Sequence, residues 1–398
     1  MTDMNIKLKS KPGTPAVGDD EFFGRKAELR LLIEKVTRGN SVYISAPRRI
    51  GKTSLMQRAE KVLEGSGHIC FFYTLEGSFP ADWIYKLAMD MYERANVKDS
   101  VVALIKNIIS SEKLSWQEAL KSIINSEQWD RQGKNFFKAL YDSCPDGKRI
   151  VIFLDELAIM IQNMQDNQPE NEHFLEWLRS IHQEYHKKIS FVIASSIGLH
   201  PLLKRLKLST HVNYLENFQL DAWRPETAKE CILALARGTE NAIEISPETA
   251  ERMTEMIGWC SPYYVQVFFS SVHDFLTINK SFSCSIDDLP EIYSKYLIRS
   301  IGPTLSHMEE RLEKSLSKLE YKLARKVLNM IAQNDGDTVK AELRKIKDEK
   351  EFGNKINEES FRNVIDVLEH DGYIEETDAG CRFLSKLLRD WWAKRYGN

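Results

Sequence analysis

A lysine and a hydroxyl residue in a turn between an apolar run and a helical pattern give the strongest chemical signal in this sequence. Residues 46–53 are Ala-Pro-Arg-Arg-Ile-Gly-Lys-Thr, which matches Gly-x4-Gly-Lys-Ser/Thr except at its first position. The largely apolar residues 41–44 precede this turn, and a helical pattern follows it. In such a strand–loop–helix arrangement, backbone N–H groups and the positive end of the helix dipole face an anion.

This phosphate-binding loop, or P-loop, predicts a site for ATP or ADP with Mg²⁺. We expect Lys52 to reach the β- and γ-phosphates and Thr53 to hold Mg²⁺. Ala in place of the first Gly is accommodated if that position needs no positive φ. The residues expected along the phosphates are Ala46, Pro47, Arg48, Arg49, Ile50, Gly51, Lys52, Thr53 and Ser54.

Two adjacent acids follow an apolar run about one hundred residues further on, in the pattern called Walker B. Residues 151–154 are Val-Ile-Phe-Leu, and Asp155 and Glu156 come next. A buried strand places such acids at its carboxyl end, where ligands gather in open α/β sheets. We expect Asp155 to hold the Mg²⁺ shell and Glu156 to polarise the attacking water as general base, with Lys52 as the third catalytic residue.

A polar residue at the end of a further strand is expected beside the γ-phosphate. Residues 189–194 are apolar, apart from Ser190, and run into Ser195 and Ser196. Either serine could sense or position the phosphate, and a serine that only caps the next turn is an equally supported alternative.

The elements that must position these residues follow an alternating pattern. Short apolar runs at 41–45, 69–73, 149–154 and 189–194 alternate with helical patterns, which predicts a parallel sheet covered on both faces. From Trp223 onward the pattern is helical only, with helix starts at Pro225 and Pro247 and a break near residues 301–303. Helices at 321–333, 338–349 and 358–370, then a hairpin and a closing helix, predict a winged helix-turn-helix.

The fold class is therefore α/β, with a P-loop NTPase parallel sheet followed by an α-helical lid and a winged-helix domain. The expected domains are a flexible tail at 1–18, a P-loop core at 19–222 with a helical insertion at 82–143, a lid at 223–300, and a linker helix with the winged helix at 301–398.

Composition gives few other clues to function. The 398 residues carry a net charge of −3, with 42% hydrophobic and 28% charged residues, as in ordinary soluble proteins. The six cysteines lack Cys-x-x-Cys spacing, so neither a zinc site nor a disulfide framework is indicated. The sequence contains no apolar secretory signal region and no run of about eighteen apolar residues, so we expect a cytoplasmic protein with no membrane partner.

Two motifs together resemble the archaeal ATPase family, within the STAND and AAA+ class of P-loop proteins. Residues 22–29 match Phe-x-Gly-Arg-x-x-Glu-Leu, and the P-loop continues into Thr-Ser-Leu. The usual loop of the family begins with Gly, where this chain has Ala46. The resemblance extends through Leu-Asp-Glu at 154–156 to the closing segment at 382–392, and thus covers most of residues 20–398.

The resemblance implies further site residues. Phe23, Gly24 and Arg25 are expected to line the adenine pocket, although these residues could equally form a hydrophobic staple and an N-terminal turn. The Gly-x-Pro sensor motif of the lid aligns with residues 260–262, where Cys260 replaces the Gly and Pro262 remains. If subunits assemble, an arginine finger is expected, and the candidates are Arg179, Arg205, Arg224 and Arg237.

The charge of the C-terminal region disfavours DNA binding. Residues 316–398 contain sixteen Lys and Arg and sixteen Asp and Glu, whereas duplex-binding modules show a basic excess. The expected recognition helix, at 358–370, is acidic, and the basic stripe at 339–350 is the feature that favours DNA.

The sequence thus predicts an ATP-driven switch that hydrolyses ATP slowly and acts with a protein partner or effector, or as a homo-oligomer. Two alternatives stay open: a nucleotide-bound adaptor that does not hydrolyse ATP, and a DNA-binding regulator.

Overall fold

The computed structural model divides into two compact units, each described here by itself. It describes residues 12–94, 128–164, 166–239, 242–334, 336–352 and 355–396. The sheet unit comprises Arg25–Ala46 and Lys52–Leu220, and the helical unit comprises Met1–Gly24, Pro47–Gly51 and Asp221–Asn398. Residues 1–11 of the expected tail and 95–127 of the expected insertion lie outside the described residues.

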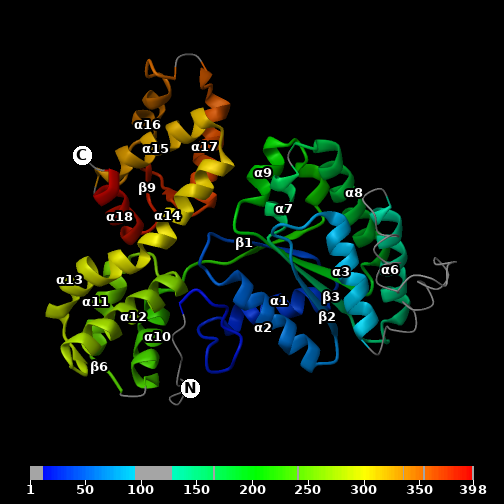
Figure 1. Cartoon of the computed structure of the whole chain (residues 1–398), viewed down its shortest axis with the longest axis horizontal. Helices are drawn as coiled ribbons and strands as arrows, with labels where there is room; N and C mark the ends of the chain where they lie inside the picture. The colour runs from blue at the N-terminus through cyan, green and yellow to red at the C-terminus, as the bar shows by residue number, and fades with distance from the viewer. Residues whose placement is uncertain are drawn as a thin grey trace, which may run out of the picture. The chain divides into compact units, whose positions relative to one another are not determined.

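The sheet unit contains a five-stranded sheet in the order β2-β3-β4-β1-β5 (Figure 1). All of its strand pairs are parallel, as the alternating pattern predicted. Four of the strands coincide with the predicted runs to within one residue at each end. The strands are β1 (Val42–Ser45), β2 (Ile69–Thr74), β3 (Ile150–Asp155), β4 (Ile189–Ala194) and β5 (Glu216–Gln219).

Strand β5 was not foreseen, because its sequence Glu-Asn-Phe-Gln is almost wholly polar. It is an edge strand that pairs only with β1, and Phe218 alone among its side chains is fully buried. An edge strand buries so little surface that its sequence need not be apolar.

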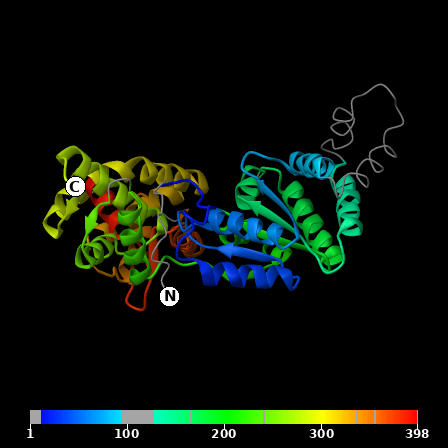
Figure 2. The same cartoon turned by 90° about the horizontal axis from the view of Figure 1, so that it is seen from below.

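Helices cover both faces of this sheet. Helix α2 packs on β2, β3 and β4, and α1 packs on β4 beside α2. Helices α3, α6 and α8 lie over the opposite face (Figures 1 and 2). Alternate strand residues such as Phe71, Ile152 and Phe191 lie in one core with residues of these helices. The helices and the 3₁₀ helix η1 are α1 (Lys26–Thr37), α2 (Lys52–Gly65), α3 (Pro80–Glu93), α6 (Trp129–Ser143), α7 (Leu157–Asn163), α8 (Gln168–Tyr185), α9 (Leu199–Arg205) and η1 (Ser209–Val212).

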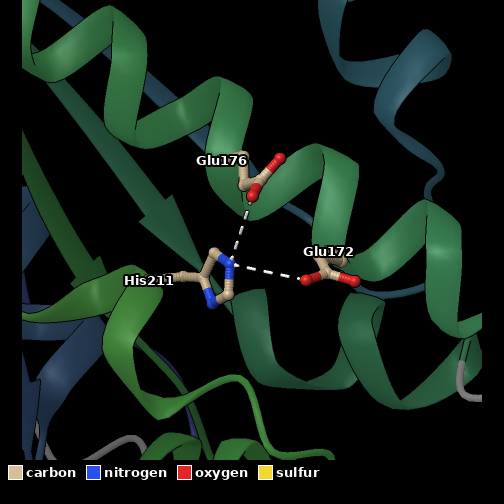
Figure 3. Close-up of side chains that lie close together, drawn as sticks. All are labelled: Glu172, Glu176 and His211. Atoms are coloured by element: carbon tan, nitrogen blue, oxygen red, sulfur yellow. Dashed lines mark ion pairs between the residues drawn. The ribbon is translucent and has the colours of Figure 1, made fainter.

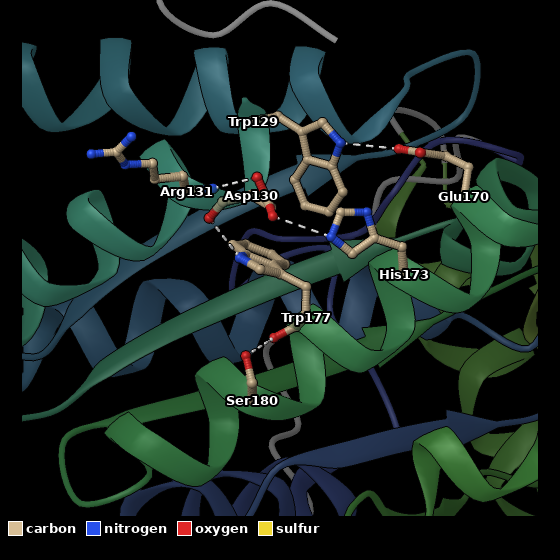
Figure 4. Close-up of polar contacts among 7 residues, drawn as sticks. All are labelled: Trp129, Asp130, Arg131, Glu170, His173, Trp177 and Ser180. Carbon is tan, nitrogen blue, oxygen red and sulfur yellow. Dashed lines mark hydrogen bonds and ion pairs between the residues drawn. The ribbon is translucent and has the colours of Figure 1, made fainter. Parts of the chain in front are cut away.

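Helices α6 and α8 are joined by indole hydrogen bonds and ring packing (Figure 4). Trp177 Nε1 donates to the Asp130 carbonyl at 2.8 Å, and Trp129 Nε1 donates to Glu170 Oε1 at 3.0 Å. The two indole rings meet edge to face, with centroids 5.1 Å apart. Such pairs satisfy buried N–H groups while they bury large rings, so this cluster holds α8 against α6.

The helical unit begins with helices that start at the predicted prolines. Pro225 and Pro247 open α10 and α11, each with a glutamate in the first turn. The first part of this unit contains α10 (Pro225–Gly238), β6 (Glu244–Ile245), α11 (Pro247–Ile257), α12 (Pro262–Asn279), β7 (Ser283–Cys284), the 3₁₀ helix η2 (Ile286–Asp288), α13 (Leu289–Glu291), the π-helix η3 (Ile292–Leu297) and α14 (Ile298–Ser315).

The predicted break at residues 301–303 is wrong, because α14 runs through it with Pro303 inside the helix. Proline removes one helical hydrogen bond and disfavours a helix interior by about 3 kcal/mol. Ile301, Leu305 and Leu312 on the same helix are fully buried in the core of the unit. Burial of this apolar face outweighs the cost of the proline.

The last part of the chain has the predicted order of three helices, a hairpin and a closing helix. Its elements are α15 (Lys318–Ala332), α16 (Lys340–Lys347), α17 (Glu358–His370), β8 (Ile374–Glu376), β9 (Cys381–Phe383) and α18 (Lys386–Tyr396). Strands β8 and β9 pair antiparallel, and Thr338 adds a bridge to Cys381. This is the order of a winged helix-turn-helix. Within the described ranges, no helix has the length and apolar character needed to cross a membrane.

Candidate functional site

Three strand ends place the predicted catalytic residues at one edge of the sheet. Strand β4 lies between β1 and β3, and Ala194 at its end is level with both Ile44 and Asp155. Because parallel strands end at the same edge, the segments after β1, β3 and β4 emerge together. The P-loop, the Asp-Glu pair and the two serines all begin at these ends.

Lys52 is the first residue of α2, and its ammonium group turns back toward the start of the loop. The side chain is buried, and its Nζ donates to the Ala46 carbonyl at 2.8 Å. Ala46 has no positive φ, so the conformational condition for alanine at this position is met. A buried ammonium on a backbone carbonyl can exchange that acceptor for a phosphate oxygen without a new desolvation cost.

Two residues of the loop adopt a left-handed backbone. Arg49 has φ +66° and Gly51 has φ +95°. A Cβ on Gly51 would meet no described atom within 4 Å, so the backbone conformation, and not lack of space, requires glycine here. Of the other loop residues, Ile50 is buried, whereas Pro47, Arg48 and Ser54 are half-buried.

Thr53 and Asp155 meet directly, although 102 residues separate them in sequence. The Thr53 hydroxyl donates to Asp155 Oδ2 at 2.6 Å, and the backbone N–H of Glu156 donates to Oδ1 at 3.1 Å. Burial raises the pKa of the Asp155 carboxyl, and the negative charge of Glu156 adds to this effect. The Thr53 hydrogen bond and the charge of Lys52 act in the opposite direction. A buried carboxylate in this setting favours a bound cation.

Glu156 turns away from β3 and lies against the end of β4. Its backbone is left-handed, with φ +64°, and it precedes the first residue of α7. Its Oε2 accepts from the Ser196 N–H and the Ser196 hydroxyl, both at 2.8 Å, and from the Ser195 hydroxyl at 3.2 Å. Both candidate serines therefore contact the proposed base, and Ser196 supplies two of the three donors.

The segment expected at the adenine makes a tight turn against Trp223 in the helical unit. The Phe23 ring meets the Trp223 ring edge to face, with centroids 6.0 Å apart. Gly24 has φ +69°, and a Cβ there would lie 2.9 Å from Trp223 Nε1. The sequence indicated Trp223 only as part of a helix start. Its aromatic side chain was the signal that could have suggested packing against the Phe23 segment. In the sheet unit, Arg25 is buried and paired with Glu28 at 2.8 Å.

The lid motif lies at the start of α12 in the helical unit. Pro262 is the first residue of the helix, and Cys260 is a buried thiol whose pKa is raised by burial to about 11. The intervening Ser261 was not predicted, yet its hydroxyl donates to the Arg49 carbonyl at 2.6 Å. The Arg49 guanidinium also lies 4.5 Å from the centroid of the Tyr263 ring. These contacts join the left-handed residue of the loop to the motif of the lid.

The four arginine-finger candidates lie on three elements. Arg179 is on α8 and Arg205 ends α9, whereas Arg224 precedes α10 and Arg237 lies in its last turn.

Solved structures resemble this chain over almost its whole length. The Walker-type ATPase of Pyrococcus abyssi superposes with a TM-score of 0.66 at 14% identity, covering 95% of this chain and 98% of that one. The ORC2 protein of Aeropyrum pernix, solved as ADPNP-ADP complexes, superposes with a TM-score of 0.51 at 13% identity, covering 94% of each chain. At these identities the likeness shows the fold, which is that of a P-loop NTPase.

A family model gives the more specific result. No curated protein matches the sequence. Residues 22–259, more than half of the chain, match the model described as an ATPase domain predominantly from Archaea. The matched range includes the P-loop, the Asp-Glu pair and both serines. The chain therefore belongs to this family of ATPase domains.

Proposed function

We propose that this protein binds ATP with Mg²⁺ and hydrolyses it slowly, as a conformational switch that acts with a partner. The observation that carries the proposal is the 2.6 Å contact between Thr53 Oγ1 and Asp155 Oδ2. It joins the two residues that the sequence assigns to Mg²⁺, one from the start of α2 and one from the end of β3, and leaves the proposed base adjacent in the chain. An ordinary turn at residues 46–53 would give no reason for this pairing.

The donor atoms fit Mg²⁺. A hydroxyl and a carboxylate are hard oxygen ligands, and Mg²⁺ binds through one or two such groups together with substrate phosphates. The buried Asp155 carboxyl is held against Thr53 in this structure. Bound Mg²⁺ would neutralise charge on the β- and γ-phosphate oxygens.

The chain's own residues then have separate roles. Lys52 would exchange the Ala46 carbonyl for phosphate oxygens, and the N–H groups of the loop would add donors. Glu156 would accept a proton from the attacking water. Oε2 of Glu156 is occupied by the two serines, and in the described part of the chain no protein donor is seen at Oε1. Oε1 is therefore the oxygen that we assign to the water.

Slow turnover follows from the charge of the site. Lys52 is the cation that the contacts above bring to the catalytic residues. Phosphoryl transfer in related mechanisms gains roughly 10³–10⁵-fold when an arginine adds to the stabilisation of the transition state. We infer that a protein partner, or a second copy of this chain, supplies that cation.

A nucleotide-bound adaptor is the second candidate. The departures at Ala46 and Cys260 leave it open, whereas the intact Asp155 and Glu156 favour hydrolysis. The two functions differ in one measurement, the release of phosphate from saturating ATP over hours.

Two substitutions test the proposal. Lys52→Ala should abolish ATP binding measured by calorimetry, whereas Lys61→Ala, which removes an exposed lysine of the same helix, should leave it unchanged.

Glu156→Gln should retain ATP binding and lower turnover by roughly 10²-fold or more, because a general base contributes about 10²–10⁴-fold. Unchanged ATP affinity in Lys52→Ala would refute the phosphate site, and parental turnover in Glu156→Gln would refute the base.

A further inference from the structure

A second group of ligand-type side chains lies in the sheet unit and shares no residue with the nucleotide site. Glu172 and Glu176 project from α8 toward His211 of η1 (Figure 3). His211 Nε2 lies 3.6 Å from Glu176 Oε1 and 4.0 Å from Glu172 Oε1. One donor atom from each residue lies within 4.8 Å of the other two. Within the described ranges, no other group of three such residues comes this close together.

The hydrogen bonds of His211 fix which nitrogen faces the carboxylates. Its Nδ1 lies 3.1 Å from the Leu208 carbonyl oxygen. A carbonyl can only accept, so Nδ1 carries the hydrogen and Nε2 is the atom presented to Glu172 and Glu176. A histidine that binds a metal usually donates its other N–H to such an acceptor, which fixes the tautomer and the ring. The side chain of His211 is also only 13% exposed, so its position is well defined.

The spacing of the three groups leaves room for an ion. Two glutamates at i and i+4 on one helix face repel each other weakly, and a cation bound between them would relieve that repulsion. A proton on Nε2 would be expected to form a hydrogen bond of about 2.8 Å to one carboxylate. The observed separations of 3.6 and 4.0 Å are longer. In a tetrahedral zinc site with bonds of about 2.0–2.1 Å, neighbouring ligand atoms are about 3.3 Å apart.

We propose that Glu172, Glu176 and His211 form a binding site for one Zn²⁺ ion. Imidazole nitrogen with carboxylate oxygen suits zinc, whereas Mg²⁺ and Ca²⁺ prefer sets made of oxygen alone. The glutamate side chains are 51% and 62% exposed, so they can close by the fraction of an ångström that coordination needs. Water would complete the tetrahedron at the exposed side.

The bound ion would join α8 to the segment that follows the nucleotide-facing strand. Helix α9 and η1 connect Ser196, at the end of β4, to β5. Gln168 Nε2 already ties the start of α8 to this segment, because it donates to the Leu206 carbonyl at 3.1 Å. Zinc at His211 would add a second, stronger tie one turn further along, so the segment would become more rigid.

The test is a Zn²⁺ titration by calorimetry, with the full chain purified without a histidine tag. We expect one ion per chain in the wild type, and an affinity at least about tenfold lower in His211→Ala and in Glu176→Gln. His307→Ala is the matched control, because His307 lies 3.9 Å from a single glutamate, Glu310, and should leave zinc binding unchanged. The titration is repeated with Asp155→Asn, which removes the acidic ligand proposed for Mg²⁺ and should retain the zinc site.

Two further readouts separate this site from loss of folding. Co²⁺ in place of Zn²⁺ should give visible absorption of a four-coordinate site in the wild type and not in His211→Ala. Amide exchange of residues 206–213 should slow when Zn²⁺ is added to the wild type. The proposal is overturned if the wild type binds no Zn²⁺ at micromolar concentration, or if His211→Ala binds it as tightly as the wild type.

Discussion

The side chain of Glu156 is oriented by two serines that belong to a different strand. All three donors converge on the same carboxylate oxygen, and two of them come from Ser196. A hydrogen bond to a charged group contributes about 1.5–3 kcal/mol. The hydroxyl of Ser196 therefore contributes substantially to keeping the Glu156 carboxylate in this orientation. We therefore propose that the serines position the catalytic base.

Replacement of Ser196 should weaken catalysis without weakening binding. In Ser196→Ala the Glu156 carboxylate keeps the backbone N–H but loses the hydroxyl donor. We expect kcat to fall roughly tenfold, equivalent to about 1.4 kcal/mol, with KM for ATP unchanged. Steady-state phosphate release measures both quantities.

Ser195→Ala is the matched control, because its hydroxyl makes the longer contact of 3.2 Å. We expect a smaller loss of kcat in this variant. A rise of kcat in Ser196→Ala would contradict the positioning role, since it would mean that the serines hold Glu156 away from the water.

At this scale the sequence indicates the residues but not their orientation. The adjacency of Asp155 and Glu156 predicted two roles, and in the structure the two carboxylates lie in different environments. The Asp155 carboxylate accepts a hydrogen bond from Thr53, and the Glu156 carboxylate accepts one from Ser196. The separation depends on the left-handed backbone of Glu156. No local sequence pattern predicts a positive φ at a glutamate, because this conformation is uncommon for any residue other than glycine.

Helix α2 carries a carboxyl group, Glu60, whose surroundings disfavour its ionised form. Burial raises the pKa of Glu60 to about 7, the nearby charge of Glu64 adds to this, and Arg94 opposes it. An acid whose pKa is raised in the folded state stabilises the protein below its unfolded pKa, near 4.5. That stability is lost as the pH rises from about 4.5 to about 7. Above pH 7 the contribution of Glu60 to the free energy of unfolding no longer changes with pH.

The substitution Glu60→Gln should therefore stabilise the sheet unit at pH 8 and leave it almost unchanged at pH 5. Because Glu60 is only half-buried, solvent screening reduces the expected gain to about 1 kcal/mol, or roughly 2–4 °C in Tm. Differential scanning calorimetry at the two pH values measures it. Glu93→Gln, which alters an exposed carboxyl of α3, should give the same Tm change at both pH values, and equal shifts for Glu60→Gln would refute the prediction.

Elements were predictable where one interaction dominates them. Strands β3 and β4 are buried on both faces, so their sequences are nearly all apolar and their ends were predicted to within one residue. Strand β5 pairs with β1 and is also held by polar contacts of Glu216 with Lys35 and Asn40, so it needs no apolar run that a sequence pattern could show. Helix α14 shows the opposite failure, since a strong local signal at Pro303 is overridden by burial of Ile301 and Leu305. Local rules fail where tertiary packing is the larger contribution.

The whole molecule carries little charge with which to attract nucleic acid. Its net charge is −3, and the C-terminal residues 316–398 are balanced at sixteen of each sign. Phosphate contacts supply most of the affinity in nonspecific DNA binding, and each requires an available cation. A fold of the winged helix-turn-helix order is compatible with DNA binding but does not establish it.

Of the five cations of the basic stripe at 339–350, three on α16 form ion pairs with acids of other elements. Lys340 pairs with Glu376 of β8 at 2.8 Å. Arg344 and Lys347 both pair with Glu358 of α17, at 3.3 and 3.5 Å. The stripe that favoured DNA in the sequence is therefore partly paired with acids of β8 and α17, which its local pattern could not reveal.

We accordingly expect the wild type not to bind a 20-base-pair duplex at about 0.1 M salt, as measured by fluorescence anisotropy. The double substitution Glu358→Gln and Glu376→Gln changes the net charge from −3 to −1 and removes the acids of α17 and β8 that pair with three cations of α16. This variant should gain weak binding that disappears as salt is raised, because counterion release drives it.

The matched control is Glu255→Gln with Glu291→Gln, which gives the same change in net charge at ion pairs of α11 and α13. It should gain no DNA binding. Tight binding by the wild type with a steep salt dependence would contradict this account and favour the DNA-binding regulator, since it would mean that cations outside this stripe form the contact surface.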